Sequence, residues 1–418
     1  MVAQATPTAA ETPTAPTVAE PPAAPAAPAV AEPGAPVLSL DQAISLAIAA
    51  NRSLAAARLG RRVAAANVEV ARERPNPDLA LEEDRETPHD LLTVSQTVES
   101  AGKRRRRVAL AQAQSASGEA DLAKTAAELR NQVRRAYYAL AAAERRAVLG
   151  DVLLELAGRT LATARQRFDA GDAPHLEVLQ AELASAQADN EARGVRSLLA
   201  AGRADLNTLL ARPPATPVAT GGEFAAVGVP PVPDPAAATE RALAANAELS
   251  LLDRKIVEEG TKLELARAQR YPDPVVNGTL THRAQPDFDW GWHLGVTVNL
   301  PIFTRHQAEV DVEERTLAQL KAQRDARAEE IGGEVYSADV QAATAREAAL
   351  RFRDEILPRA EEVERLAEDS YRSGQTGLAA LLQAFQATRD VRLQAIQAGL
   401  DYQNALADLE KAMGVALP

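Results

Sequence analysis

The chain is an internal duplication, and this constrains its fold more than any other feature of the sequence. Residues 49–78 (AANRSLAAARLG…) and 244–273 (AANAELSLLDRK…) carry the same pattern at an offset of 195. Further along, a segment starting at Arg167 matches one starting at Tyr371, with Gly171 aligned on Gly374 at an offset of 203. The second copy is therefore longer by eight residues between the two matches. Any fold must be built from two similar units.

The extra length of the second copy contains a long strand. FDWGWHLGVTVNL, residues 288–300, is apolar at every even position, and strict alternation predicts a strand with one apolar face. With PVVNGTLTHR (274–283) and a turn at 284–287 it predicts a β-hairpin. The first copy offers a shorter hairpin, with a weak strand after Asp78 and a clearer one at 92–98, joined across Thr87-Pro88. The second hairpin is taller by about four residues per strand, or ~13 Å.

The rest of each copy has helical periodicity. Ser39 is a candidate N-cap for the first helix, and a continuous helix over 102–169 would reach ~100 Å. Gly332-Gly333 and Pro358 predict a bend in the second long helix. The predicted helical segments are 40–74, 102–169, a return after the turn 170–174 to about 211, and a second set from 304 through the turn 373–377 to 413.

Pro-rich segments divide the chain into four parts. Residues 1–36 are rich in Pro, Ala and Thr, which is typical of a disordered, extended tether. An export signal is not evident, although Ala3-Gln4-Ala5 leaves open the remnant of a cleavage site. The predicted organisation is the tether at 1–36, a first repeat at 37–212, a Pro/Gly-rich connector at 213–235 and a second repeat at 236–418.

Composition and missing motifs exclude several functions. A formal net charge of −12 argues against a nucleic-acid partner, and the run Lys103–Arg107 is better explained as a solvated ring below a membrane strand. There are no cysteines, and the five histidines lack metal-ligand spacing, so no metal site and no cofactor is predicted. Without a phosphate loop or nucleophile elbow, the sequence does not predict an enzyme.

The apolar strand face is the strongest candidate for a membrane contact. No run approaches the roughly 18–20 apolar residues of a spanning helix, so membrane contact would have to come from strands. The predicted lipid-facing residues are Trp290, Trp292, Leu294, Val296 and Val298. Four strands cannot close a barrel, since the smallest membrane barrels have about eight, so several chains would be required. The alternative is a half-buried strand covered by a helix of the same chain.

The order of elements, present twice, resembles the TolC-like outer-membrane efflux factor family over residues 37–414. The most specific markers are the two Gly turns, with Arg167-Phe168-Asp169-Ala170-Gly171 in the first copy and Tyr371-Arg372-Ser373-Gly374 in the second. Pro75-Asn76-Pro77, Asn299-Leu300-Pro301-Ile302-Phe303 and the stretch 96–104 are also similar. The resemblance implies a mainly helical chain with a small β portion, in a homotrimer with one twelve-stranded barrel in outer-membrane lipid. It also implies a periplasmic tunnel of helical hairpins that conducts passively.

The same resemblance implies sites and partners. The tips of the tunnel would dock a periplasmic adaptor working with an inner-membrane pump, and the expected tip residues are Phe168, Gly171, Asp172, Leu176, Tyr371, Gly374, Gln375 and Leu378. Relatives carry acidic gate residues six and nine positions after the second turn glycine. The gate positions here are Glu177, Gln180, Ala380 and Gln383, of which only Glu177 is acidic.

The exported substrate and one competing function stay open. Gln96, Glu99, Gly102-Lys103-Arg104 and Arg107 resemble the branch that serves heavy-metal pumps, although Ala101 stands where a second glycine is common. This favours metal cations over drugs as cargo. The alternative to a channel is a periplasmic coiled-coil adaptor or helical scaffold, which would also show long helical hairpins with exposed tips.

Overall fold

A computed structural model describes residues 36–83, 85–86, 88–221, 234–284, 286 and 288–415. The predicted tether therefore lies outside the described residues except for Pro36, as do most of the 213–235 connector and parts of both hairpin turns. The strands are β1 (Val37–Leu38), β2 (Asp78–Glu83), β3 (Asp90–Thr97), β4 (Ala219–Thr220), β5 (Pro274–Ala284) and β6 (Phe288–Val298). The helices are α1 (Leu40–Ala50), α2 (Arg52–Arg72), α3 (Lys103–Asp169), α4 (His175–Leu209), α5 (Pro235–Ala245), α6 (Ala247–Gln269), α7 (Gln307–Arg351), α8 (Leu357–Arg372) and α9 (Leu378–Met413), with a π-helical turn at Phe352–Ile356 between α7 and α8.

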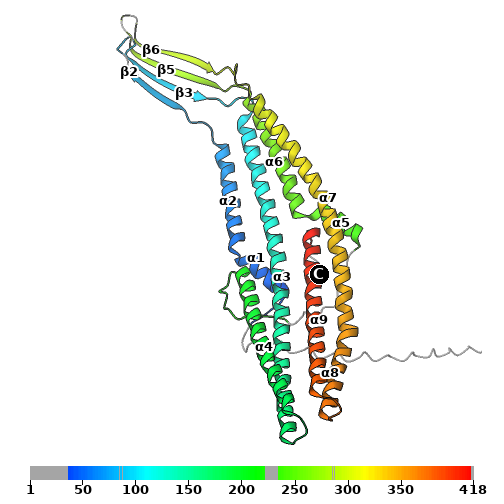
Figure 1. Cartoon of the computed structure of the whole chain (residues 1–418). Coiled ribbons are helices and arrows are strands. Elements are labelled where there is room, and N and C mark those ends of the chain that lie inside the picture. Colours follow the sequence, from blue (N-terminus) through cyan, green and yellow to red (C-terminus); the bar gives the residue numbers. More distant parts are fainter. Residues whose placement is uncertain are drawn as a thin grey trace, which may run out of the picture.

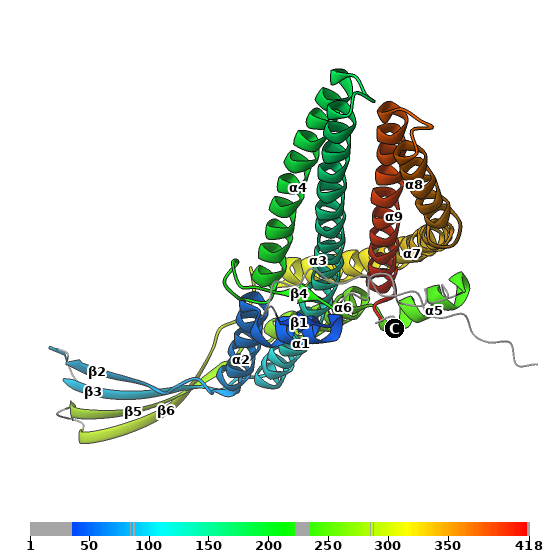
Figure 2. The same cartoon turned by 90° about the horizontal axis from the view of Figure 1, so that it is seen from below.

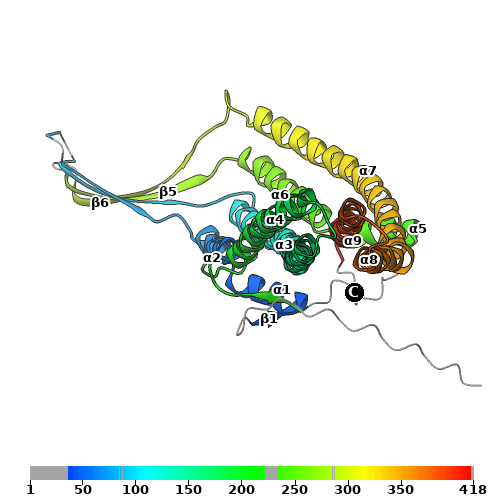
Figure 3. The ribbon, with the colours of Figure 1, turned by 60° about the horizontal axis from the view of Figure 1, so that its bottom comes forward.

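The molecule is elongated, with a sheet at one end and two helical tips at the other (Figure 1). Helix α3 has 67 residues, so it is ~100 Å long and carries the chain from the sheet to the first tip. Helix α4 returns beside α3, and α9 returns beside α8 and α7, so that the two hairpins lie side by side (Figure 2). Helix α7 curves past α6 and α9 on its way from the sheet (Figure 3). The predicted mainly helical fold with a small β portion is confirmed.

The two hairpins join into one antiparallel sheet in the order β2-β3-β5-β6. Strand β3 pairs with β5 from Asp90↔His282 to Thr97↔Val275, so the two copies of the repeat meet at the centre of the sheet. The sequence pattern predicted each hairpin but not this pairing, which joins segments almost 200 residues apart in the chain. The predicted strand at 92–98 begins earlier, at Asp90, and the strand from 288 ends at Val298.

The predicted single helix over 40–74 is wrong, because the chain breaks it at Asn51. Ser39 caps α1 as expected, in a capping box with Gln42. Asn51 then caps α2, its Oδ1 accepting from the backbone N–H groups of Ser53 (3.0 Å) and Leu54 (3.1 Å). Its Nδ2 donates to the carbonyl oxygen of Leu209 at the end of α4 (3.3 Å). A side chain that satisfies three backbone groups stabilises the break.

The second copy repeats this arrangement at Asn246. Its Oδ1 accepts from the N–H groups of Glu248 (2.8 Å) and Leu249 (3.4 Å) at the start of α6, and its Nδ2 donates to the carbonyl oxygen of Ala412 in α9 (3.1 Å). Gly414 ends α9 at φ +66°, and a Cβ there would lie 2.7 Å from the Cα of Asn246. Each asparagine therefore ties the helix leading to the sheet to the end of a helix returning from a tip.

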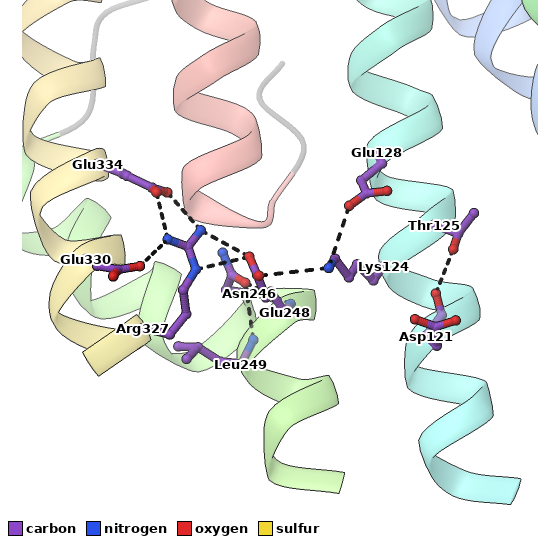
Figure 4. A network of polar contacts seen from close by, with 10 residues as sticks. All are labelled: Asp121, Lys124, Thr125, Glu128, Asn246, Glu248, Leu249, Arg327, Glu330 and Glu334. Carbon is purple, nitrogen blue, oxygen red and sulfur yellow. Dashed lines mark hydrogen bonds and ion pairs between the residues drawn. The ribbon is translucent and has the colours of Figure 1, made fainter. Parts of the chain in front are cut away.

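A network of charged side chains surrounds Asn246 and joins three helices (Figure 4). Arg327 of α7 contacts Glu248 of α6 (3.0 Å) and Glu334 of its own helix (2.7 Å). Lys124 of α3 approaches the same Glu248 at 3.8 Å. Because Arg327 is only 22% exposed and shared by several carboxylates, the network holds α3, α6 and α7 together at mid-height.

The hydrogen-bonding pattern of the second long helix changes just before Pro358. Helix α7 runs without interruption through Gly332 and Gly333, so the bend predicted at these glycines stays a prediction. The π-helical turn, Phe352–Ile356, lies immediately before Pro358. Proline has no N–H to donate and its ring crowds the preceding turn, so a wider turn at this point accommodates it.

We predict that Asn246→Ala destabilises the protein. The substitution removes the cap of α6, which costs about 0.5–2 kcal/mol, and leaves the Ala412 carbonyl without its partner. The melting temperature of the detergent-purified protein measures the effect. Asn190→Ala, at an exposed position within α4, is the matched control and is expected to melt with the wild type. Equal melting temperatures for all three proteins would show that the cap contributes nothing.

Candidate functional site

The middle of one face of the sheet is apolar. Pairing places Trp292 and Leu294 of β6 in rows with apolar residues of the other strands, whereas the row of Trp290 continues through His282, Asp90 and Glu83. Two of the resulting rows are Trp292, Leu280, Leu92 and Leu81, and Leu294, Gly278, Val94 and Leu79. The predicted lipid-facing residues are all exposed, at 67% for Trp290, 74% for Trp292, 72% for Leu294, 65% for Val296 and 42% for Val298. No helix of the described chain covers this face, whereas the alternative of a half-buried strand requires such a helix.

The opposite face of the sheet is polar. The hydroxyl oxygens of Thr93 and Thr279 lie 3.0 Å apart across β3 and β5, and Asn277 donates to the Thr297 hydroxyl (2.8 Å) across β5 and β6. Within the part of the chain that the structure describes, β2 and β6 each pair with one strand only. The sheet therefore has one apolar face, one polar face and two edges with unpaired backbone groups.

The basic run at the foot of the sheet bonds the ends of neighbouring helices. Arg104 donates to the carbonyl oxygen of Arg72 (2.7 Å), and Arg107 to those of Ala71 (3.1 Å) and Glu73 (2.8 Å), at the end of α2. Lys103 donates to the Tyr271 carbonyl oxygen (2.6 Å), just after α6. Cations bonded to C-terminal carbonyls complement the helix dipole. These three side chains therefore bind the ends of α2 and α6, and the predicted solvated ring stays a prediction.

Two further residues of the same motif complete this junction. Gln96 donates to the carbonyl oxygen of Pro75 (3.1 Å), and Glu99 forms an ion pair with Arg107. Asp273 pairs with Lys103 (2.8 Å) and accepts from the backbone N–H of Ser100 (2.7 Å). Burial acts to raise the pKa of the Asp273 carboxyl, but the hydrogen bonds from Lys103 and Ser100 outweigh it and hold that pKa below its usual range.

Both tips turn through a glycine at positive φ. Gly171 (φ +82°) donates to the Phe168 carbonyl oxygen, and Asp172 to that of Arg167, at 2.9 and 2.8 Å. The second tip repeats this pattern with Gly374 at φ +72°. There Gly374 donates to the Tyr371 carbonyl oxygen (3.1 Å) and Gln375 to that of Ser370 (2.9 Å). Each helix thus ends in the same Schellman motif, whose left-handed residue favours glycine.

The two tips differ in what they expose. In the first, Phe168 is 41% and Leu176 61% exposed. In the second tip, Tyr371, which aligns with Phe168, is 2% exposed and Leu378 is 1% exposed, and both pack with Ala164, Ala181 and Leu381. Asp172 and Gln375 are exposed. The second tip therefore uses its apolar pair to hold the hairpins together, whereas the first presents its pair on the surface.

Arg167 and the predicted gate residue Glu177, both at the first tip, contact Tyr371 at the second tip. The Arg167 guanidinium lies over the Tyr371 ring, 4.9 Å from its centroid, and 3.6 Å from Oε2 of Glu177. The Tyr371 hydroxyl donates to the same carboxylate at 3.5 Å, and burial raises the pKa of Tyr371. The Glu177 carboxylate is therefore bound by two side chains of the same chain, Arg167 and Tyr371. Arg167 was missed in the sequence analysis, where its only signal was its place beside Phe168 in the tip motif.

The remaining predicted gate residues lie nearby. Gln180 and Gln383, from different repeats, line one cavity of about 440 Å³ between α3, α4 and α9. Ala380 is exposed beside the second tip. Over the described residues, no group of three or more His, Cys, Asp and Glu side chains is placed to hold a metal ion. No described helix is both long and apolar enough to span a bilayer.

A sheet with one apolar face, joined to long helical hairpins that end in exposed turns, is the architecture of outer-membrane efflux channels. The chain belongs to the outer membrane efflux protein family, whose model matches residues 43–212 and 238–415. The resemblance inferred from the sequence is thereby confirmed. This is a family of channels and not of enzymes, and its members are outer-membrane proteins.

Individual relatives share the same overall length and fold. The cobalt-zinc-cadmium resistance protein CzcC of Cupriavidus metallidurans is 24% identical over 382 residues, which cover 90% of both chains. A solved structure of CusC superimposes with a TM-score of 0.73 at 16% identity, covering 90% of this chain and 92% of CusC. VceC of Vibrio cholerae gives a TM-score of 0.72 at 16% identity, covering 90% and 96%. The chain has the fold of these proteins over nearly its whole length.

We predict that Val296→Arg and Thr297→Arg have different effects, because the two residues lie on opposite faces of β6. A charge on a lipid-facing strand costs about 2–4 kcal/mol near the bilayer midplane, whereas one on the polar face has water available. The yield of oligomer extracted from outer membranes is expected to fall for Val296→Arg and to stay near wild type for Thr297→Arg. Equal yields of the two variants would contradict a lipid-facing assignment of the apolar face.

Proposed function

We propose that the chain forms a homotrimeric exit duct of a tripartite efflux system, with each copy giving four strands to one twelve-stranded barrel. The four-stranded sheet, with its exposed apolar face and two unpaired edges, carries this proposal. Lipid would cover the apolar face, and β2 of one copy would pair with β6 of the next until the ring closes. The polar face, with Thr93, Asn277 and Thr297, would then line the lumen.

The helical hairpins would continue this lumen into the periplasm as a tunnel. The ~100 Å length of α3, and the direct connection of α3 and α7 to the foot of the sheet, support the proposal. The tips would dock a periplasmic adaptor, which connects the duct to an inner-membrane pump. Conduction would be passive, with the energy supplied by the pump, and the tunnel would narrow near Glu177, Gln180, Ala380 and Gln383.

Heavy-metal cations are the proposed cargo. The support is the relative named as a cobalt-zinc-cadmium resistance protein, together with the motif Gln96, Glu99, Gly102-Lys103-Arg104 and Arg107. Gln96, Lys103, Arg104 and Arg107 bond backbone carbonyls at the junction, and Glu99 pairs with Arg107. The motif therefore supports a relationship to that branch and not a ligand set, since an exit duct conducts what the pump delivers.

A periplasmic adaptor or helical scaffold remains the second candidate because it would also show long hairpins with exposed tips. The exposed sheet face argues against it, since a water-soluble protein rarely leaves so large an apolar surface uncovered. Cell fractionation separates the two. A duct is found in outer membranes and needs detergent for release, whereas recovery of the native protein in the soluble periplasmic fraction would support the scaffold.

We predict that Gly374→Val abolishes export while leaving the oligomer in the outer membrane. A β-branched residue is strained at φ +72°, although no atom lies within 4 Å of the added Cβ, so the turn and not the packing is changed. Gly377→Ala, at the same tip but at φ −82°, is the matched control and is expected to export normally. Export and membrane-inserted oligomer are measured in the same cells. Normal export by Gly374→Val would show that this tip is not part of the docking site. Loss of the oligomer would show that the glycine is required for folding.

A further inference from the structure

The foot of the sheet carries a positive charge that contrasts with the rest of the chain. Segments 72–77, 99–107, 267–273 and 299–305 contain ten Lys and Arg but only three Asp and Glu, in a chain of net charge −12. At the opposite end of the sheet, the described residues of segments 82–90 and 283–289 include five acidic and two basic side chains. The sheet is therefore strongly polarised along its strands.

Hydrogen bonds place three of the four basic segments at the same level. Arg104 and Arg107 bond the end of α2, and Lys103 bonds Tyr271 after α6, so three of the segments meet at the start of α3. The fourth connects β6 to α7, and Arg267 of α6 reaches Glu314 of α7 at 2.8 Å. These contacts arrange the segments around the foot of the sheet, between the strands and the helices (Figure 1).

Most of the basic side chains in these segments have partners, but four do not. Arg72 pairs with Glu69, Arg106 approaches Glu264 at 3.9 Å, and Arg267 pairs with Glu264 and Glu314. The exceptions are Arg74, Arg105, Arg270 and Arg305, which are all exposed and have no carboxylate partner in the described chain. Four unneutralised guanidinium groups at one level fit an anionic surface.

Exposed apolar side chains lie among these arginines. Tyr271 is 60% exposed, Leu300 65%, Ile302 61% and Phe303 98%. Leu300 and Ile302 follow the last residue of β6, so exposed apolar side chains continue beyond the end of the strand. An aromatic side chain at the edge of an apolar band, next to arginines, is typical of the boundary between lipid tails and headgroups.

We propose that Arg74, Arg105, Arg270 and Arg305, with Tyr271 and Phe303, form a collar that binds the phosphate groups of anionic phospholipids. The proposal rests on the proposed function, because the apolar face must lie in a bilayer for the collar to reach the headgroups at its foot. Guanidinium groups bind phosphate oxygens bidentately, and the rings would lie among the first carbons of the lipid tails. The collar would fix the depth of the sheet in the membrane and select the lipids around it.

The test compares two variants, each with four Arg→Gln substitutions. The collar variant changes Arg74, Arg105, Arg270 and Arg305, and the matched control changes Arg52, Arg159, Arg254 and Arg359, which are exposed on the helices. Native mass spectrometry of the detergent-purified oligomer counts bound lipid during titration with phosphatidylglycerol or phosphatidylcholine. Because each basic residue near an anionic surface contributes roughly a fivefold factor in affinity, the collar variant is expected to bind phosphatidylglycerol at least tenfold more weakly than wild type. The control is expected to match wild type, and added salt is expected to weaken wild-type binding.

Other results would contradict either the collar or the proposed function on which it rests. Equal binding of the two lipids by the wild type, or unchanged binding by the collar variant, would overturn the collar. Failure of the collar variant to form the oligomer would also overturn it, since these arginines would then serve contacts between chains. Reconstitution of the wild type into nanodiscs of phosphatidylcholine alone is the separate control. If the wild type enters no bilayer, the proposed function fails and not only the collar.

Discussion

The structure depends on a four-stranded sheet whose apolar face is uncovered and whose edge strands are unpaired in a single chain. Its apolar face, from Leu79 in β2 to Leu294 in β6, is exposed, and its edge strands each pair on one side only. In water such a surface drives aggregation, whereas in the proposed trimer lipid would cover the face and further copies would pair the edges. The long helices would let such a duct reach its proposed partners in the periplasm. The junction at Lys103–Arg107 fastens these two parts together.

The chain consists of two similar repeats, which differ in the height of their hairpins and in the exposure of their tips. Asn51 and Asn246 keep the same cap and the same bond to a returning helix in both copies. The hairpins differ in height, with 11 residues in β6 against eight in β3. The tips differ in exposure, since Tyr371 is buried where its counterpart Phe168 is exposed. The asparagines shared by both copies tie the helices of each repeat together, and the altered positions leave the first tip with the larger exposed apolar surface.

Local patterns in the sequence predicted much of this fold. Alternation predicted the strands and glycine spacing predicted both tips. The even-numbered residues of β6 were predicted to form its apolar face. Features that depend on distant partners could not be predicted. The break at Asn51 is stabilised by Leu209, 158 residues away, and the pairing of β3 with β5 joins the two repeats. The contact of Arg167 and Glu177 with Tyr371 likewise requires both tips. The carbonyl partners of Lys103, Arg104 and Arg107 could not be predicted, because backbone acceptors leave no trace in a sequence.

Disulfide cross-linking of the sheet edges tests the central claim most directly, because the chain contains no cysteine of its own. Leu79→Cys in β2 is combined in turn with single cysteines at Trp290, Trp292, Leu294, Val296 and Val298 in β6, and oxidised membranes are run on non-reducing gels. The account predicts that at least one pair yields a covalent species of three chains, each of 44.3 kDa, that neither single variant forms. Cross-linked products that stop at two chains, or bands at the mass of one chain for every pair, would contradict a closed ring built from three sheets.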